Sequence, residues 1–161
     1  MPEARQVRMI NSVGTLRSMR RFGVTFQDGL GELIDNAVDA GARHIAIRVA
    51  YEDGFLTMVL ADDGVGIPEA VPGRPDIAAT VQHVLRYGGK ITHVNGNPFP
   101  IGKFGYGLSQ TATCLTQRTT VHSRVTGGRW RSCYSDWEDL QVHGAKLPPE
   151  QVDDAPNTTL L

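Results

Sequence analysis

The order of helix-like and strand-like segments predicts a single α+β domain. Residues 25–40 carry apolar side chains at helical spacing, and residues 108–115 predict a further helix. Residues 43–61 and 118–137 each have the pattern of two strands around a glycine-containing turn, which favours antiparallel hairpins. The chain has 161 residues, which is the size of one domain that buries its own core.

The amino-acid composition gives no support for a membrane-spanning, secreted or nucleic-acid-binding protein. The chain is 40% hydrophobic and 20% charged, as soluble globular proteins are. Its net charge of −1 gives no overall electrostatic argument for binding nucleic acid or a membrane. No apolar run is long enough to span a bilayer, and the N-terminus lacks the apolar core of a signal peptide. We expect a cytoplasmic protein, or a nuclear one in a eukaryote.

The two cysteines, Cys114 and Cys133, form neither a metal-binding motif nor a disulfide framework. They fit a reducing compartment, and we expect them to be buried structural thiols. Near the N-terminus, residues 12–21 predict a short helix that is rich in arginine. That basic face is either a partner surface or, more commonly, a solvated helix face.

One polar stripe marks the helix predicted at residues 25–40, where Thr25 caps the start and Gly41 the end. Glu32, Asn36 and Asp39 are spaced i, i+4 and i+7, so they project from one face. A carboxylate, an amide and a second carboxylate suit a hydrated cation and an activated water, although a solvated polar face explains this run alone equally well. The apolar face is expected to contain Leu30, Leu33, Ile34, Ala37 and Val38.

The next segment alternates, and Ile45, Ile47 and Val49 predict one buried face of a half-buried strand. A turn at residues 52–54 leads into a return strand at residues 55–61. The sequence Asp-Asp-Gly-Val-Gly at residues 62–66 follows. Its glycines allow a ligand to approach the backbone closely, but an acidic turn has the same composition.

Residues 71–107 form a long segment with a weaker pattern. A helix is predicted at residues 76–85, with Ile77, Val81 and Val84 inward, and a loop at residues 87–100. The glycines of residues 102–107 lead into the helix predicted at residues 108–115, an arrangement that suits phosphate binding. It is not a Walker A loop, because no Gly-Lys-Ser/Thr element ends it. Towards the C-terminus, residues 140–156 are predicted to be irregular and residues 157–161 to begin a strand.

Three motifs in this order, Glu32…Asn36…Asp39, residues 62–66 and residues 102–107, resemble those of the GHKL superfamily of ATPases. That superfamily includes gyrase B subunits, heat-shock chaperones of the ninety-kilodalton class, sensor histidine kinases and MutL-type repair proteins. The amino-acid sequences of the motifs are most similar to those of Microrchidia-type and chaperone-type members. The resemblance implies the Bergerat ATP-binding fold, an α/β sandwich with a mixed, mostly antiparallel sheet and helices on one face.

By this resemblance, Glu32 corresponds to the general base that activates water. Asn36 corresponds to the Mg²⁺ ligand that bridges the phosphates, and Asp39 to a supporting acidic residue near the nucleotide. The cofactor implied is therefore Mg²⁺, with ATP as the substrate.

The adenine and phosphate positions are implied in the same way. Asp62 corresponds to the carboxylate that receives the adenine amino group. Thr158 resembles the threonine that supports this carboxylate through water, although Asn157 stands where family members usually have glycine. The other nucleotide-binding positions implied are Gly64 and Gly66 at the adenine and Gly102, Lys103, Phe104, Gly105, Tyr106 and Gly107 at the phosphates.

The resemblance implies slow hydrolysis of Mg·ATP to ADP and phosphate, as the nucleotide-driven switch of a larger machine. A non-hydrolysing ATP-gated switch and a histidine kinase catalytic domain are the alternatives. Residues 1–161 are expected to be one ATP-binding domain, the N-terminal part of a longer protein, with a lid at about residues 71–107. Expected partners are ATP or ADP, a second copy in an ATP-dependent homodimer, and a downstream transducer domain or client. Nucleic acid is expected to bind only through other regions, and no membrane is expected.

Overall fold

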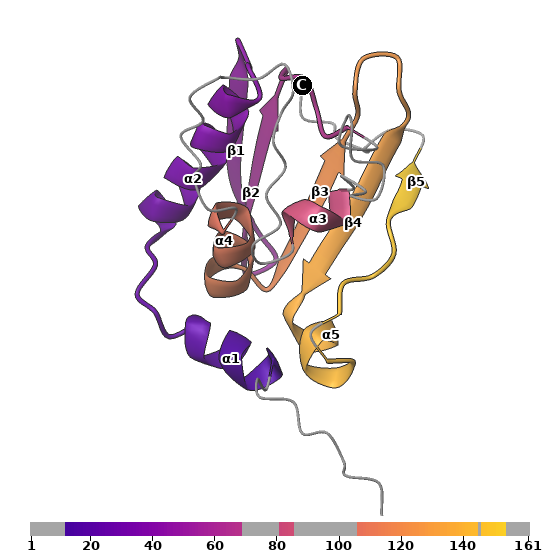
Figure 1. Cartoon of the computed structure of the whole chain (residues 1–161). Helices are drawn as coiled ribbons and strands as arrows, with labels where there is room; N and C mark the ends of the chain where they lie inside the picture. Colours follow the sequence, from indigo (N-terminus) through magenta and orange to yellow (C-terminus); the bar gives the residue numbers. More distant parts are fainter. Residues whose placement is uncertain (1–11, 69–80, 86–105, 145, 154–161) are drawn as a thin grey trace, which may run out of the picture.

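The computed structural model describes residues 12–68, 81–85, 106–144 and 146–153 (Figure 1). Several predictions therefore lie outside the described residues: the first part of the helix at residues 76–85, the loop at residues 87–100, Gly102–Gly105 and the strand at residues 157–161. Within the described part, pairs of consecutive helices alternate with pairs of consecutive antiparallel strands, and one helix and one strand follow at the end.

The predicted central helix is confirmed as α2 (Phe26–Asp39), which follows α1 (Ser12–Met19). Thr25 and Asp28 form a reciprocal cap. The Asp28 N–H donates to Thr25 Oγ1 (3.2 Å) and the Thr25 N–H donates to the Asp28 carboxylate (2.9 Å). The hydrogen bond from the Thr25 side chain lowers the pKa of Asp28 below its ordinary value. Gly41 follows the helix at φ +74°, which glycine adopts without strain.

Strands β1 (Ile45–Glu52) and β2 (Phe55–Asp62) form the predicted hairpin. Asp53 and Gly54 both have positive φ, at 52° and 83°, as a tight turn between right-twisted strands requires. The predicted burial is wrong. Ile47 and Val49 are 44% and 52% exposed. Alternation identifies which side chains share a face, but it does not determine whether another layer packs on that face.

The second sheet contains β3 (Arg118–Ser123), β4 (Trp130–Asp136) and β5 (Gln151–Asp153), in that order and antiparallel. The prediction of an irregular segment at residues 140–156 is wrong, because it contains β5 and the end of α5 (Trp137–Val142). Trp137, predicted to lie in a strand, begins this helix. The Asp136 carboxylate accepts hydrogen bonds from the N–H groups of Glu138 (2.9 Å) and Asp139 (3.4 Å), which starts the helix there.

The core lies between the second sheet, α3 (Val81–Val84) and α4 (Gly107–Leu115). Its buried members are Val81, Leu85, Ala112 and Cys133, so the inward position predicted for Val81 is confirmed. Cys133 is buried, Cys114 is half-buried, and both are free thiols whose pKa is raised by burial. Partly buried apolar side chains surround the core: Ile67, Val84, Leu108, Val121 and Leu147.

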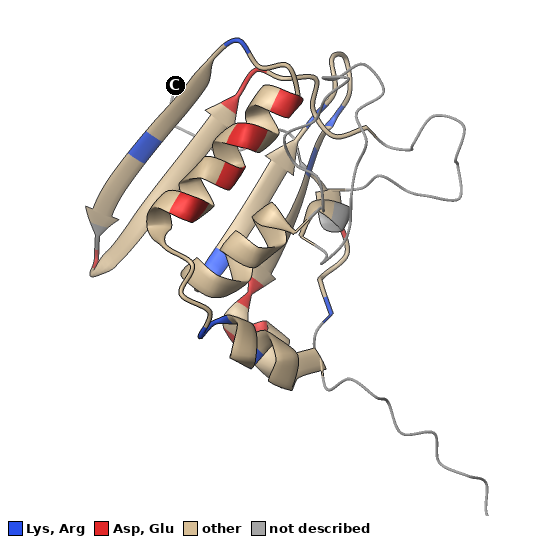
Figure 2. Ribbon diagram, turned by 60° about the vertical axis from the view of Figure 1, so that its left-hand side comes forward, with Lys and Arg blue, Asp and Glu red and all other residues tan. Residues whose placement is uncertain are grey.

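Helices α2 and α4 touch at Gly29. A Cβ added to Gly29 would lie 2.5 Å from Leu115 Cδ1 and 2.9 Å from Thr111 Cγ2, so any larger residue there would have to displace these side chains. Helices α2, α3 and α4 lie on the same side of the strands (Figures 1 and 2). The predicted α+β architecture is confirmed, and every described strand pair is antiparallel. No described helix has the length and apolar character needed to cross a membrane.

Candidate functional site

The first feature of the site is the contact between Glu32 on α2 and the beginning of α4. A Cβ added to Gly107 would lie 2.0 Å from Glu32 Oε2 and 2.9 Å from its Cδ. The Glu32 carboxylate therefore lies against the first residue of α4. Tyr106 at the N-cap makes no side-chain capping hydrogen bond. Two motifs that are distant in sequence meet here, at a helix end that carries partial positive charge.

The polar stripe of α2 extends from this contact. Figure 2 shows acidic residues along the length of the helix. Glu32 and Asn36 are exposed, as predicted, and within the described residues neither side chain forms a hydrogen bond.

The stripe is not exposed throughout, because Asp39 is only 7% exposed. Val38, assigned to the apolar face, is 42% exposed. Val38 sits at the edge of the apolar arc, at about 100° of rotation per residue. Asp39 lies at the helix end, where the Val65 N–H donates to the Ala40 carbonyl (3.0 Å) and the segment after β2 encloses the helix.

That segment begins with Asp62, whose Oδ1 accepts a hydrogen bond from the Gly64 N–H (2.9 Å). A Cβ on Gly64 would lie 2.8 Å from Ala40 Cβ, so the turn packs against the end of α2. Gly66 has φ +74°, and a Cβ there would lie 2.1 Å from the Arg124 carbonyl oxygen. Both glycines are therefore required by the close approach of other parts of the chain.

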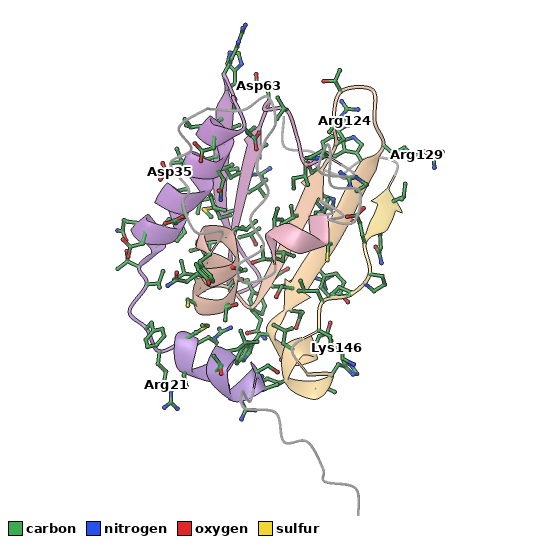
Figure 3. The ribbon with its side chains drawn as sticks, viewed as in Figure 1. Arg21, Asp35, Asp63, Arg124, Arg129 and Lys146 are labelled. Atoms are coloured by element: carbon green, nitrogen blue, oxygen red, sulfur yellow. The ribbon has the colours of Figure 1, made fainter. Side chains whose placement is uncertain are left out.

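Asp63 is a structural residue of the site that sequence reasoning missed. Its Oδ1 accepts from the N–H groups of Arg43 (2.7 Å) and His44 (2.9 Å), and its Oδ2 lies 2.8 Å from His44 Nδ1. The backbone hydrogen bond from His44 is the largest cause that holds the pKa of Asp63 well below its ordinary value. Figure 3 shows Asp63 at the end of the first sheet. It fastens the start of the Asp62–Gly66 segment to the link between α2 and β1.

The oxygen donors of the site suit a cation that is coordinated mostly by nucleotide phosphates and water and only in small part by the protein. Among the described residues, no three His, Cys, Asp or Glu side chains gather to hold a metal ion. The exposed amide oxygen of Asn36, one helical turn from Glu32, is the type of single oxygen donor with which Mg²⁺ binds when phosphates and water fill its other positions.

Of the residues predicted for the site, the structure describes Glu32, Asn36, Asp39, Asp62, Gly64, Gly66, Tyr106 and Gly107. It brings Glu32 together with Gly107, and it fastens the Asp62–Gly66 segment to the other end of α2. Gly102, Lys103, Phe104, Gly105 and Thr158 lie outside the described residues.

A family model described as "Histidine kinase-, DNA gyrase B-, and HSP90-like ATPase" matches residues 24–159. The chain belongs to this ATPase family. The matched range contains all three motifs, so the GHKL resemblance found in the sequence is confirmed. The narrower likeness to Microrchidia-type and chaperone-type members stays a prediction.

Curated relatives include proteins of two Thermus species that are named DNA mismatch repair protein MutL. The Thermus aquaticus protein is 29% identical over 132 residues, which cover 78% of this chain and 22% of that protein. A Thermus thermophilus protein is 42% identical over 45 residues, which cover 28% of this chain and 8% of that protein. The chain thus spans about a fifth of the length of the Thermus aquaticus relative.

Proposed function

We propose that this chain binds Mg·ATP and hydrolyses it slowly to ADP and phosphate, as the nucleotide-driven switch of a larger machine. The observation that carries the proposal is the contact of the Glu32 carboxylate with Gly107 at the start of α4. Membership of an ATPase family supports nucleotide binding. The contact supports hydrolysis, because it brings a base to a helix end suited to phosphates.

Each residue of the site has a separate role in this proposal. The N–H groups at the start of α4 bind phosphate oxygens, and Asp62 accepts a hydrogen bond from the adenine amino group. Asn36 holds Mg²⁺, which when bound neutralises charge on the phosphate oxygens. Glu32 orients a water molecule and takes its proton as the water attacks the terminal phosphate. A positioned general base contributes about 10²–10⁴-fold to a rate.

The test separates binding from hydrolysis. Glu32→Ala removes the base but no group that holds ATP, so nucleotide affinity stays within a few-fold while single-turnover hydrolysis falls by about 10²-fold or more. Asn36→Ala removes the metal ligand, so Mg²⁺-dependent affinity and hydrolysis fall together. Glu138→Ala, which truncates an exposed glutamate on α5, is the matched control and leaves both unchanged.

A substitution on the other side of the contact checks the same geometry. In Gly107→Ala, the new Cβ occupies the position of Glu32 Oε2 and displaces that carboxylate, so hydrolysis falls in the otherwise unaltered chain. In a Glu32→Ala background, the same change has no further effect on hydrolysis. If Glu32→Ala hydrolyses ATP as fast as the unaltered chain, Glu32 is not the base. If the unaltered chain binds ATP but does not hydrolyse it in single turnover, a non-hydrolysing ATP-gated switch is the better description.

A further inference from the structure

Ile67, the residue after Gly66, is held by both of its backbone polar groups. Its N–H donates to Ser123 Oγ (2.9 Å), and its carbonyl accepts from Arg131 Nη2. Ser123 and Arg131 are directly opposite one another in the β3–β4 pairing. Both are buried. One cross-strand pair of the second sheet therefore holds the end of the Asp62–Ile67 segment.

Arg131 is paired in turn with Glu150, immediately before β5. The distance from Arg131 Nη1 to Glu150 Oε1 is 3.3 Å, and the two side chains are only 6% and 18% exposed. The other carboxylate oxygen of Glu150 accepts from the Val81 N–H (2.7 Å). Val81 is fully buried and begins α3, which lies beside β4 in Figure 1. Arg131 of the ion pair therefore binds Ile67 and Glu150 binds Val81. Ile67 precedes residues 69–80 in the sequence, and Val81 follows them.

A buried ion pair is an inefficient way to stabilise a fold. Removing two charges from water costs free energy that their attraction only partly offsets, and apolar replacements are often neutral or stabilising. A buried pair does fix geometry, because each charge must keep its hydrogen-bond partners. Here two of those partners are backbone groups of Ile67 and Val81, so what the pair determines is their position.

The position of Ile67 affects the rest of the segment because the segment has little freedom. Asp63 fastens its beginning to residues 43 and 44. Gly66 lies too close to the Arg124 carbonyl to accept even a Cβ. Gly64 and Val65 keep their own hydrogen bonds to Asp62 and Ala40, so release of Ile67 shifts the Gly66 end of the segment relative to Asp62.

We propose that Ser123, Arg131 and Glu150 are positioning residues for the adenine end of the nucleotide site, acting through Ile67. This inference rests on the proposed function, since it assigns Asp62–Gly66 to the adenine. The phosphate end is built separately, by α2 and α4. Loss of the positioning residues consequently weakens adenine nucleotides while leaving the binding of bare polyphosphate unchanged.

Ser123→Ala is the first variant, because it removes one oxygen and leaves the chain able to fold. Calorimetry with Mg·ADP should show affinity reduced about fivefold or more, the scale of one lost hydrogen bond. Mg·tripolyphosphate should bind as it does to the unaltered chain. Ser123→Thr keeps the hydroxyl and should restore ADP affinity. Ser135→Ala, on β4 opposite Thr119, is the matched control and should bind both ligands normally.

The ion pair is tested without leaving a buried charge unpaired. Arg131→Met with Glu150→Gln is neutral, and the glutamine oxygen still accepts from the Val81 N–H. This double variant should fold, exchange the amide protons of Val65 and Ile67 faster, and bind ADP more than about tenfold more weakly with tripolyphosphate unaffected.

The failures are distinguishable. If the unaltered chain binds neither ADP nor ATP, the proposed function is wrong. If it binds ADP and both the Ser123→Ala chain and the double variant bind it equally well, the positioning inference is wrong and the proposed function stands. Equal loss of ADP and tripolyphosphate binding also overturns the inference, since it indicates a general structural defect.

Discussion

At the scale of single residues, Asp63 shows how an exposed carboxylate organises a turn. It accepts two backbone N–H groups and faces His44, and these bonds hold its pKa below the ordinary value. A carboxyl group whose pKa is lower in the folded chain than in the unfolded chain stabilises the fold above the unfolded pKa, about 3.9. This contribution is lost as the pH falls below that value towards the folded pKa.

We predict that Asp63→Ala lowers the urea midpoint by a constant amount from neutral pH down to about pH 5. The difference from the unaltered chain should shrink below about pH 4, where Asp63 is protonated in the unfolded chain while it stays ionised in the folded chain. Asp28→Ala is the matched control, because Asp28 also has a lowered pKa from side-chain and backbone hydrogen bonds. Both variants should show this pH profile, but only Asp63→Ala should weaken ADP binding. An effect of Asp63→Ala that persists undiminished at pH 2 contradicts the electrostatic explanation.

The roles of individual residues were predictable from the sequence only along one helix. The i, i+4 spacing placed Glu32 and Asn36 on one exposed face, and the structure agrees. The contact of Glu32 with Gly107 joins segments far apart in sequence, and only the family resemblance linked them. The burial of Asp39 and the exposure of Val38 were missed. Periodicity gives the direction of a side chain around the helix axis, whereas the segment after β2 decides what covers the helix end.

At the scale of elements, the packing of α2 on α4 determines where Glu32 on α2 meets Gly107 at the start of α4. Gly29 is the point of closest approach, and Gly31 on the same helix has no atom within 4 Å of the position of a Cβ. The pair offers a matched test of that packing, since both glycines lie inside α2.

We predict that Gly29→Ala destabilises the chain by about 1–3 kcal/mol, because the new methyl group forces Leu115 and Thr111 out of place. Gly31→Ala should stabilise it by about 0.5–1 kcal/mol, the usual gain when alanine replaces glycine inside a helix. Equilibrium urea unfolding of both variants gives the two values. If both substitutions stabilise the chain, α2 and α4 are not packed closely at Gly29.

Elements with strong local signals were predicted well, and those that depend on distant partners were not. The reciprocal cap of Thr25 and Asp28 and the Asp53-Gly54 turn set the start of α2 and the β1–β2 hairpin. The short strand β5 is defined by its pairing with β4 and has no alternation of its own to reveal it. Helix α5 was missed because its cap, Asp136, is also the last residue of β4.

At the scale of the whole molecule, arginine side chains in and just after α1 hold this N-terminal helix against residues of the C-terminal half of the chain. The Arg20 guanidinium donates to the Thr116 carbonyl (3.0 Å) and lies 4.6 Å from the centre of the Trp137 ring. Arg17 donates to Gln141 on α5 (3.0 Å). The helix therefore presents a fixed surface, with Arg21 pointing away from the body in Figure 3.

A basic surface held in a fixed position on a nearly neutral molecule suits a contact with an acidic surface of a second copy. Such a contact forms only when that second surface has been assembled. Members of this ATPase family often dimerise, and we propose that ATP binding creates that complement here. The predicted behaviour is a monomer without nucleotide and a weak dimer with a non-hydrolysable ATP analogue, measured by sedimentation velocity over a range of protein concentrations. Arg21→Glu should weaken the dimer, whereas Arg48→Glu, an exposed substitution on β1, should not. Since charge attraction between exposed groups is screened, the nucleotide-dependent dimer should also dissociate as salt rises. A tight dimer in the absence of nucleotide, or one insensitive to Arg21→Glu, places the association surface elsewhere and separates it from the ATP cycle.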